Sequence, residues 1–309
     1  MQYEGQICRP PMERASYMLP VAVGCSYNAC TFCGLFKHLK YRELPKEQIE
    51  AEMIRVHNAG GNPKTIFLGD GNAFGLATDH LLWILERIHR YFPGCEAVNM
   101  DATVTNISQK SDEELKALYD AGVRNLYLGI ESGLDDVLSF MKKDHNLAEA
   151  YTQIARIQKV GMIFNAHMMT GIAGKGRGLE NAEATAEFFN RTKPHKVINF
   201  NIFHHKSSAL YRDIEAGRYE AADEQEDLRE ERRFMELIEV DGMVYDAFHD
   251  VLELRFRGTF PKDKQKMLSQ VDKAIAYWDT QPSELHFFSL ICGTMPGGQE
   301  TVTGERFEK

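Results

Sequence analysis

The chain has 309 residues, of which 43% are hydrophobic, and it carries a formal net charge of −9. This length and apolar content suffice to bury a large core. The acidic balance disfavours nucleic acid as a partner, because negative charge repels a phosphate backbone. Residues 1–24 lack the apolar run of a signal peptide, and no later stretch reaches the roughly 18–20 apolar residues of a membrane span. We therefore expect a cytoplasmic protein with no membrane partner.

Strand-like apolar runs alternate with amphipathic segments up to residue 205. The runs predict six strands, at 18–24, 65–70, 96–103, 124–132, 163–172 and 196–205. The amphipathic segments predict helices at 45–58, 78–92, from 111 onward, 133–160 and 179–192. Pro45 suits a first helical turn, and Ser111 with Glu114 forms a capping box.

The strand signal stops after residue 205. Residues 224–281 are charged and predict helix, and the last two dozen residues are predicted to be irregular. Six βα repeats favour a parallel sheet with right-handed crossovers. An open doubly wound sheet and a barrel both satisfy this count.

Polar residues at alternate positions favour the barrel. Strands buried on both sides are apolar on both faces, whereas period-two spacing places each polar set here on one face of its strand. The sets are Asn99, Asp101 and Thr103; Tyr127 and Glu131; Asn165 and His167; Asn199 and Asn201. A wet interior follows, so we predict an α/β fold. It is a partial (β/α)6 TIM-like barrel over residues 1–215, with a helical C-terminal extension over 216–309.

The six cysteines are Cys8, Cys25, Cys30, Cys33, Cys95 and Cys292. Because cytosolic thiols stay reduced, the three scattered ones are expected to be small buried hydrophobes. The other three form C-x4-C-x2-C after the first predicted strand, a ligand spacing for zinc or an iron–sulfur cluster. Neither His38 nor Cys8 completes a familiar zinc pattern. Three cysteines leave one iron of a four-iron cluster open for chemistry, and this loop lies where barrel active sites form.

The cysteine triplet, with Phe32 just before its last member, resembles the cluster loop of the radical S-adenosylmethionine superfamily. The resemblance implies that Cys25, Cys30 and Cys33 hold a [4Fe–4S] cluster, with Phe32 among the cofactor-binding residues. The free iron binds S-adenosylmethionine in that family. One electron cleaves this cofactor to methionine and a 5′-deoxyadenosyl radical, which abstracts hydrogen from a substrate. The family's usual spacing is C-x3-C-x2-C, so this loop has one extra residue.

The motif LGDGNA follows the second predicted strand, where the family has a Gly-Gly-Glu turn. The resemblance implies that Gly69, Asp70 and Gly71 hold the amino group of S-adenosylmethionine. Asp70 carries the negative charge that an ammonium group needs. The residue order differs from the usual motif.

Two further motifs extend the resemblance to roughly residues 1–240. GIESG resembles the branch with methylthiotransferase and Elongator-like members, and it implies ribose contacts from Glu131 and Ser132. Lys142 or Lys143 stands where the family often has a basic residue for the cofactor carboxylate. MTGIAG implies that Ile172 lies against the adenine.

The catalytic residues beyond the cofactor site are not identified by any motif. Polar side chains of the expected interior are candidates for substrate contact or proton transfer, namely Asn99, Asp101, His167, Asn199, Asn201, His204 and His205. Tyr127 is a candidate for hydrogen-atom transfer, with simple packing as the other interpretation.

No second cysteine cluster follows residue 33, so the resemblance implies an external one-electron donor such as flavodoxin or ferredoxin. The acidic C-terminal helices are one docking face for it. The absence of RNA-binding or peptide-recognition domains favours a small-molecule substrate. Two alternatives stay open: a non-catalytic iron–sulfur or zinc protein, as electron carrier or scaffold, and a radical enzyme that modifies a peptide or tRNA. GIESG argues against the first, because an electron carrier needs no ribose site.

Overall fold

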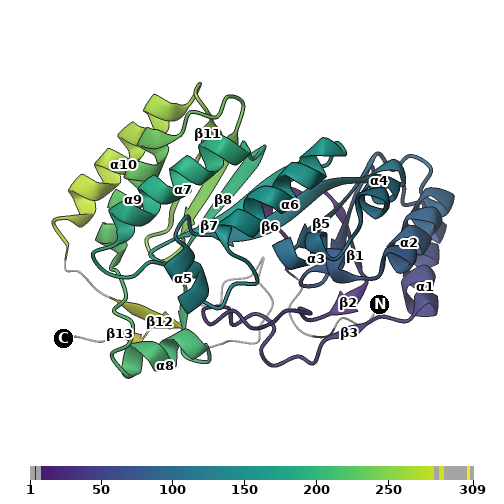
Figure 1. Ribbon diagram of the computed structural model, residues 1–309, viewed down its shortest axis with the longest axis horizontal. Helices are drawn as coiled ribbons and strands as arrows, with labels where there is room; N and C mark the ends of the chain where they lie inside the picture. The colour runs from purple at the N-terminus through teal and green to yellow at the C-terminus, as the bar shows by residue number, and fades with distance from the viewer. Residues whose placement is uncertain (1–3, 5–7, 282–284, 289–304, 307–309) are drawn as a thin grey trace. The chain divides into compact units, whose positions relative to one another are not determined.

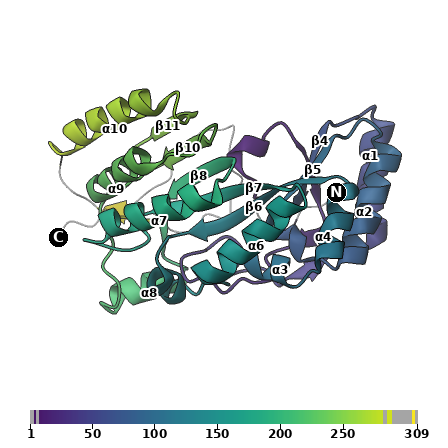
Figure 2. The ribbon, with the colours of Figure 1, turned by 45° about the horizontal axis from the view of Figure 1, so that its top comes forward.

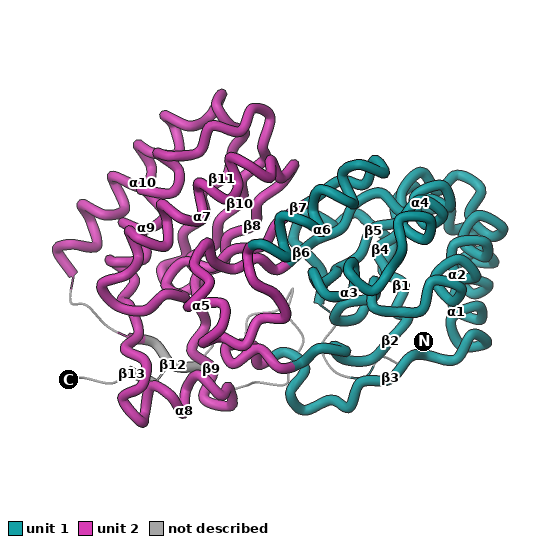
Figure 3. Tube along the Cα trace, viewed as in Figure 1, with its two compact units in different colours: residues 1–28, 35–128, 148–164 teal, residues 29–34, 129–147, 165–309 magenta. Residues whose placement is uncertain are grey.

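The computed structural model describes residues 4, 8–281, 285–288 and 305–306, and the chain divides into two compact units (Figure 3). Unit 1 consists of Met1–Asn28, Leu35–Leu128 and Ala148–Phe164. Unit 2 consists of Ala29–Gly34, Gly129–Leu147 and Asn165–Lys309. The division falls inside the cysteine segment, so Cys25 belongs to unit 1 and Cys30 and Cys33 belong to unit 2.

Unit 1 contains a parallel sheet with helices packed on it (Figure 1). The strands pair in the order β1 (Tyr17–Pro20), β4 (Thr65–Gly69), β5 (Ala97–Ala102) and β6 (Val123–Glu131). The helices are α1 (Lys46–Asn58), α2 (Thr78–Tyr91), α3 (Val104–Ser108), α4 (Asp112–Asp120) and α6 (Leu147–Lys159). Helix α2 shows why they pack, since Leu81, Ile84, Leu85 and Ile88 form a buried stripe at helical spacing.

Unit 2 contains the remaining long strands and three long helices that lie side by side (Figure 2). The strands β7 (Ile163–Thr170), β8 (Lys196–Asn201) and β10 (Val244–His249) are parallel, and β11 (Leu254–Thr259) is antiparallel to β10. The helices are α7 (Gly178–Thr192), α9 (Glu224–Leu237) and α10 (Lys264–Trp278). Phe189 packs edge-to-face on Phe234, with ring centroids 5.9 Å apart, and Phe234 packs at a tilt on Tyr245 of the sheet, with centroids 5.6 Å apart.

Shorter elements complete the described residues. Unit 1 also has η1 (Pro11–Glu13), η2 (Ala73–Gly75) and a ribbon of β2 (Ala22–Val23) with β3 (Arg42–Glu43). Unit 2 also has α5 (Asp135–Phe140), α8 (Ala209–Glu215) and a small sheet of β9 (His204–His205), β12 (His286–Phe288) and β13 (Glu305–Arg306).

The predicted α/β class is confirmed, and so is the alternation of strands and helices up to residue 205. The capping box is present as predicted. Ser111 Oγ accepts from Glu114 N at 3.2 Å, and Glu114 Oε2 accepts from Ser111 N at 2.7 Å. Both bonds satisfy backbone N–H groups that the first helical turn leaves without partners.

The prediction that no strand follows residue 205 is wrong, because β10 and β11 join the sheet of unit 2. Their charged residues alternate with buried ones, as in Arg255, Phe256 and Arg257, whereas the high charge of this region had predicted helix. Residues 133–160 are not one helix either. Helix α5 ends before Lys142, whose φ of +52° lies in the left-handed region that stops a helix.

Two smaller corrections concern the ends of the chain. The predicted strand at 18–24 divides into β1, which pairs with β4, and β2, which pairs with β3 in a separate ribbon. In the last two dozen residues, β12 and β13 are strands and most of the others, including Cys292, lie outside the described residues. The predicted domain boundary at residue 215 stays a prediction. Across the described part of the chain, no helix combines the length and apolar content needed to cross a bilayer.

Candidate functional site

Backbone hydrogen bonds hold the segment between Cys30 and Cys33 in unit 2. Thr31 N donates to Met141 O at 3.0 Å, and Leu210 N donates to Thr31 O at 3.0 Å. Met141 directly follows α5 and Leu210 lies in α8, so two elements remote in sequence fix this short segment. Both cysteines are partly buried.

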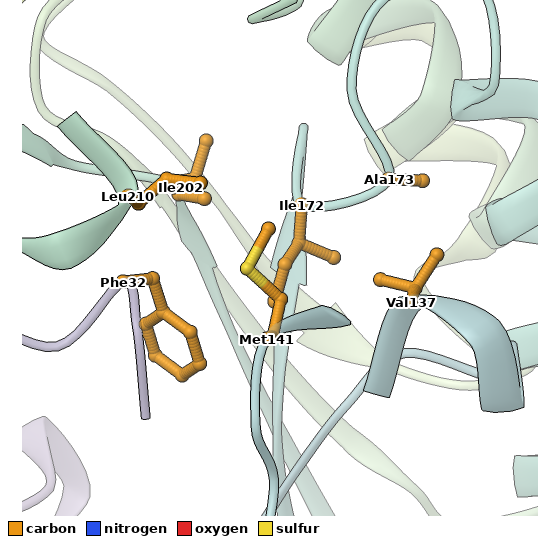
Figure 4. Close-up of a cluster of buried hydrophobic side chains, with 7 residues drawn as sticks. All are labelled: Phe32, Val137, Met141, Ile172, Ala173, Ile202 and Leu210. Carbon is orange, nitrogen blue, oxygen red and sulfur yellow. The ribbon is translucent and has the colours of Figure 1, made fainter. Parts of the chain in front are cut away.

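Phe32 belongs to a cluster of buried apolar side chains drawn in Figure 4. The cluster consists of Phe32, Val137, Met141, Ile172, Ala173, Ile202 and Leu210. Cys30 and Cys33 pack against it. Ile172, predicted to contact an adenine, is fully buried there. Unit 2 therefore brings the cysteine segment and the MTGIAG segment together.

Glu131 at the end of β6 forms a buried ion pair. Lys143 Nζ lies 3.1 Å from Glu131 Oε1, and the side chains are 7% and 10% exposed respectively. Lys142 is exposed, so the structure distinguishes the two lysines that the sequence left open. Gly129 makes room for the pair, because a Cβ there would meet Glu131 Oε1 and lie 3.0 Å from Lys143 Nζ.

The environment of Lys143 keeps it positively charged. Burial alone would lower the pKa of Lys143, but the nearby Glu131 carboxylate and Cys30 thiolate raise it above its ordinary value. Its Nζ also lies 5.9 Å from the centroid of the Phe32 ring, within the range of a cation–π contact. A buried ammonium beside a cysteine suits the binding of an anionic group at this point.

Ser132 and Gly171 are linked by a buried hydrogen-bond network that the sequence did not predict. Ser132 Oγ donates to Asn181 Oδ1 at 2.5 Å, and Asn181 Nδ2 donates to Glu230 Oε1 at 2.7 Å. Gly171 N donates to Glu230 Oε2 at 2.9 Å. Glu230 on α9 thus connects GIESG with MTGIAG, and the Ser132 hydroxyl is engaged with α7. No motif marked Asn181 or Glu230, whose pairing needs α7 and α9 to be adjacent.

Asp70 and Gly71 directly follow β4 in unit 1, beside the start of the cysteine loop. A Cβ on Gly71, where φ is +54°, would meet Gly24 O and lie 2.7 Å from Cys25 Cα. Only glycine permits this approach. Burial raises the pKa of Asp70 to about 6, although hydrogen bonds from the backbones of Gly71, Cys8 and Gly24 oppose the shift.

Asn72, for which no motif predicted a role, ties the same turn to the cysteine loop. Ser26 N and Ser26 Oγ donate to Asn72 Oδ1 at 3.0 and 3.1 Å. Asn72 Nδ2 donates to Asn106 Oδ1 at 2.9 Å. The only hint of this role in the sequence is the position of Asn72 directly after Gly71 of the turn.

Asp101 and Tyr127, two of the catalytic candidates, lie beside each other in the sheet of unit 1. Tyr127 is fully buried and donates to Glu13 Oε1 at 2.6 Å, which favours a structural role. Asn99 Nδ2 donates to both Glu13 oxygens, at 3.0 and 3.1 Å. Burial, with Asp70 and Glu13 nearby, raises the pKa of Asp101 well above its ordinary value.

His167, the third catalytic candidate, lies on β7 in unit 2. The register pairs His167 with Ile198 and Met168 with Asn199, so Asn199 points to the opposite face from His167. Asn199 Nδ2 donates to Tyr245 Oη at 3.2 Å, and Asn201 Nδ2 donates to Glu224 Oε2 at 2.5 Å. The prediction that these two asparagines share one wet face with His167 is therefore wrong.

The residues present suit an iron–sulfur cluster. Three partly buried cysteines stand within nine positions, and a lysine ammonium lies beside one of them. Thiolates are the usual ligands of such clusters. In the described ranges, no group of three His, Cys, Asp or Glu side chains is already placed to hold a metal ion.

The sequence model of the radical SAM superfamily matches residues 19–189. Over 166 residues the chain is 28% identical to the heme chaperone HemW of Bacillus subtilis, which covers 52% of this chain and 44% of that protein. Over 157 residues it is 26% identical to the tRNA-2-methylthio-N(6)-dimethylallyladenosine synthase of Hahella chejuensis, covering 49% of this chain and 35% of that protein. The chain thus spans less than half of either relative.

Two solved structures share the fold. The archaeal Methanocaldococcus infernus Elp3 matches with a TM-score of 0.54 at 15% sequence identity, over 88% of this chain and 71% of that one. Coproporphyrinogen III oxidase (HemN) from Escherichia coli, a radical SAM enzyme, also matches with a TM-score of 0.54, at 14% identity over 72% of this chain and 52% of that one. The likeness confirms the predicted fold class, a partial TIM-like barrel.

Proposed function

Because the chain belongs to the radical SAM superfamily, whose members are enzymes with a [4Fe–4S] cluster and S-adenosylmethionine as cofactors, we propose that Cys25, Cys30 and Cys33 bind the cluster. Bound there, the cluster supplies the electron that splits S-adenosylmethionine into methionine and a 5′-deoxyadenosyl radical, which takes hydrogen from the substrate. One observation carries the proposal. Cys30 and Cys33 pack on the same buried cluster as Ile172, with the Lys143 ammonium next to Cys30.

The neighbouring side chains have roles that follow from their charge and burial. Lys143 binds the cofactor carboxylate, because it is a buried cation beside a cysteine ligand. Glu131 accepts from the ribose hydroxyls, and Ile172 packs on the adenine. Asp70, when ionised, accepts from the cofactor ammonium. Ser132 does not contact the cofactor itself. Its hydroxyl donates to Asn181, and this bond fixes the strand end that carries Glu131.

The substrate in this proposal is a small molecule, and the electron comes from an external donor such as flavodoxin or ferredoxin. The net charge of −9 supports the first point, because it disfavours a nucleic-acid substrate. The tRNA-modifying relative does not argue otherwise, since the match covers 35% of that protein.

The test is anaerobic reconstitution of the full-length chain with iron and sulfide, followed by dithionite and S-adenosylmethionine. We expect about four irons per chain and formation of 5′-deoxyadenosine. Cys30→Ala should lose both, because three thiolates are needed to hold the cluster. Cys95→Ala is the matched control, since Cys95 is a buried cysteine remote in sequence from the loop.

Two results would contradict the proposal. A single bound zinc without cleavage of S-adenosylmethionine would indicate a structural metal in the loop. Equal loss of iron in Cys30→Ala and Cys95→Ala would show that the effect comes from impaired folding and not from ligation.

A further inference from the structure

Three planar side chains form a row across neighbouring strands of unit 2. The His167 ring on β7 stacks on Phe200 of β8, with centroids 5.9 Å apart and planes 13° apart. Phe200 stacks on Phe248 of β10, with centroids 5.5 Å apart and planes 19° apart. The Arg255 guanidinium on β11 continues the row, 4.5 Å from the centroid of the Phe248 ring. We call His167, Phe200 and Phe248 the aromatic row.

The aromatic row occupies the face of the sheet that the long helices leave uncovered. On the other face, Tyr245 donates to Glu231 of α9 at 3.1 Å and packs on Phe234. The register pairs Phe248 with Phe200, and Tyr245 precedes Phe248 by three positions, so these two side chains point to opposite faces. All three rings of the row are partly exposed. Rings packed under helices would be fully buried. The partial exposure of these three rings therefore shows that no helix of the described residues covers this face of the sheet.

The β11 end of the row carries net positive charge. Arg255 and Arg257 are both exposed and stand on the same face as Phe248, because the register pairs them with Phe248 and Asp246. Asp246 is the carboxylate between them. Arg255 Nε donates to it at 2.7 Å, while Arg257 Nε lies 3.8 Å from it. One carboxylate against two guanidinium groups leaves an excess cation at this end.

The His167 end of the row lies near the candidate cofactor site. Burial lowers the pKa of His167 to about 4, while Glu131 raises it and Lys143 lowers it. Both residues are therefore close enough to act on the imidazole electrostatically. The ring is neutral at physiological pH, so it serves as an aromatic surface and not as a cation.

We propose that the aromatic row binds the substrate, and that this substrate is a small molecule with a planar conjugated ring and an anionic group. The inference rests on the proposed function, which requires the substrate to lie beside the cofactor. Side chains stand upright on a sheet, so rings that stack across strands present their edges outward. Ring edges are electropositive and favour contact with the face of another conjugated ring. The anionic group then meets Arg257 and Arg255.

The test measures binding of matched probes to the reconstituted full-length chain with S-adenosylmethionine, by titration calorimetry. The probes are naphthalene-2-carboxylate, 2-naphthyl phosphate, the neutral naphthalene-2-carboxamide and cyclohexanecarboxylate, which is anionic without a conjugated ring. We expect at least one naphthyl anion to bind more tightly than the last two. The tighter of the two naphthyl anions identifies the anionic group as carboxylate or phosphate.

Variants then locate the site. Phe200→Leu, Phe248→Leu and Arg257→Gln should each weaken binding of the naphthyl anion about threefold to tenfold. Tyr277→Leu and Arg191→Gln are the matched controls, since both residues are exposed on helices. Circular dichroism spectra confirm that each variant is folded before titration.

The outcomes separate the two proposals. If the naphthyl anions bind no better than the controls, or if the row variants bind like the wild type, the inference is overturned. Formation of 5′-deoxyadenosine without substrate is followed in parallel, and we expect the row variants to retain it. If the wild type forms no 5′-deoxyadenosine, the proposed function is contradicted. The calorimetric titrations would still decide whether the aromatic row binds the naphthyl anions.

Discussion

Lys142 and Lys143 are adjacent in sequence and lie in opposite environments. Lys142 is exposed, whereas the Lys143 side chain is 7% exposed and paired with Glu131. A buried ion pair contributes little net stability, because desolvation offsets the attraction between its charges. Removing one partner strongly destabilises the fold, because the other charge stays buried without compensation.

Lys143→Met should therefore lower the free energy of unfolding by about 3–5 kcal/mol. The measurement is urea denaturation of the full-length chain at pH 7, followed by circular dichroism. Lys142→Met is the matched control and should change stability by less than about 0.5 kcal/mol. Equal effects of the two substitutions would show that Glu131 is not the buried partner of Lys143.

At the scale of elements, α7 and α9 support the candidate cofactor site from behind. Asn181 on α7 contacts both Ser132 and Glu230, and Gly171 donates to the other oxygen of Glu230. Thr185 on the same helix accepts from Gly133 N at 2.8 Å. The two strand ends at which we propose cofactor contacts are thus positioned by the side chains of two helices.

Asn181→Ala should leave Glu230 and Ser132 without this partner, and each buried polar group left unpaired costs about 1–3 kcal/mol. We also expect a higher S-adenosylmethionine concentration for half-maximal 5′-deoxyadenosine formation, with the rate at saturation retained. Glu187→Ala is the control, because its side chain is 73% exposed on the same helix. A loss of stability with unchanged half-saturation would mean that Asn181 acts on folding alone.

What the sequence predicted well at this scale is local. The capping box at Ser111 and Glu114 needs only one helical turn, and it was predicted correctly. The motif loops at strand ends could be placed because the strands before them are apolar runs. Glu230 could not be predicted as a site residue, since its role depends on α9 packing against α7 across about fifty positions of sequence.

The sequence also could not predict which face of the sheet the polar side chains of a strand occupy. Period two assigns Asn199 and Asn201 to one face of β8, but only the pairing with β7 decides which face that is. For the same reason, the aromatic row was not visible in the sequence. His167, Phe200 and Phe248 become neighbours through the register of three strands, and the sequence predicts helix where β10 lies.

For the molecule as a whole, buried titratable groups set the dependence of stability on pH. Above pH 6.5 the buried groups whose pKa values are raised all act in one direction. Burial raises the pKa of Glu230 to about 8 and those of Asp101 and Asp227 well above the ordinary value. The Glu231 carboxylate raises the pKa of His249 to about 10, although burial opposes it. In each case the folded chain binds the proton more strongly than the unfolded chain.

Below pH 6.5 the groups oppose one another. Burial lowers the pKa values of His167 and His204 to about 4, so the unfolded chain binds their protons more strongly between pH 4 and 6.5. Their contribution to stability therefore rises with pH in that window, while the contribution of the buried carboxyl groups falls. The two sets offset each other there.

The free energy of unfolding should therefore fall as the pH rises from 6.5 to 8, because the folded chain holds more bound protons than the unfolded chain throughout this range. Glu230 lies beside Glu226 and Glu231, and it contributes up to about 1.4 kcal/mol per pH unit to this fall. Urea denaturation of the reduced full-length chain at half-unit pH steps measures the slope. Glu230→Gln should flatten it, because the amide does not titrate, while Glu187→Gln should leave it unchanged. A wild-type stability that rises between pH 6.5 and 8 would mean that these carboxyl groups ionise in the folded chain as they do in the unfolded one.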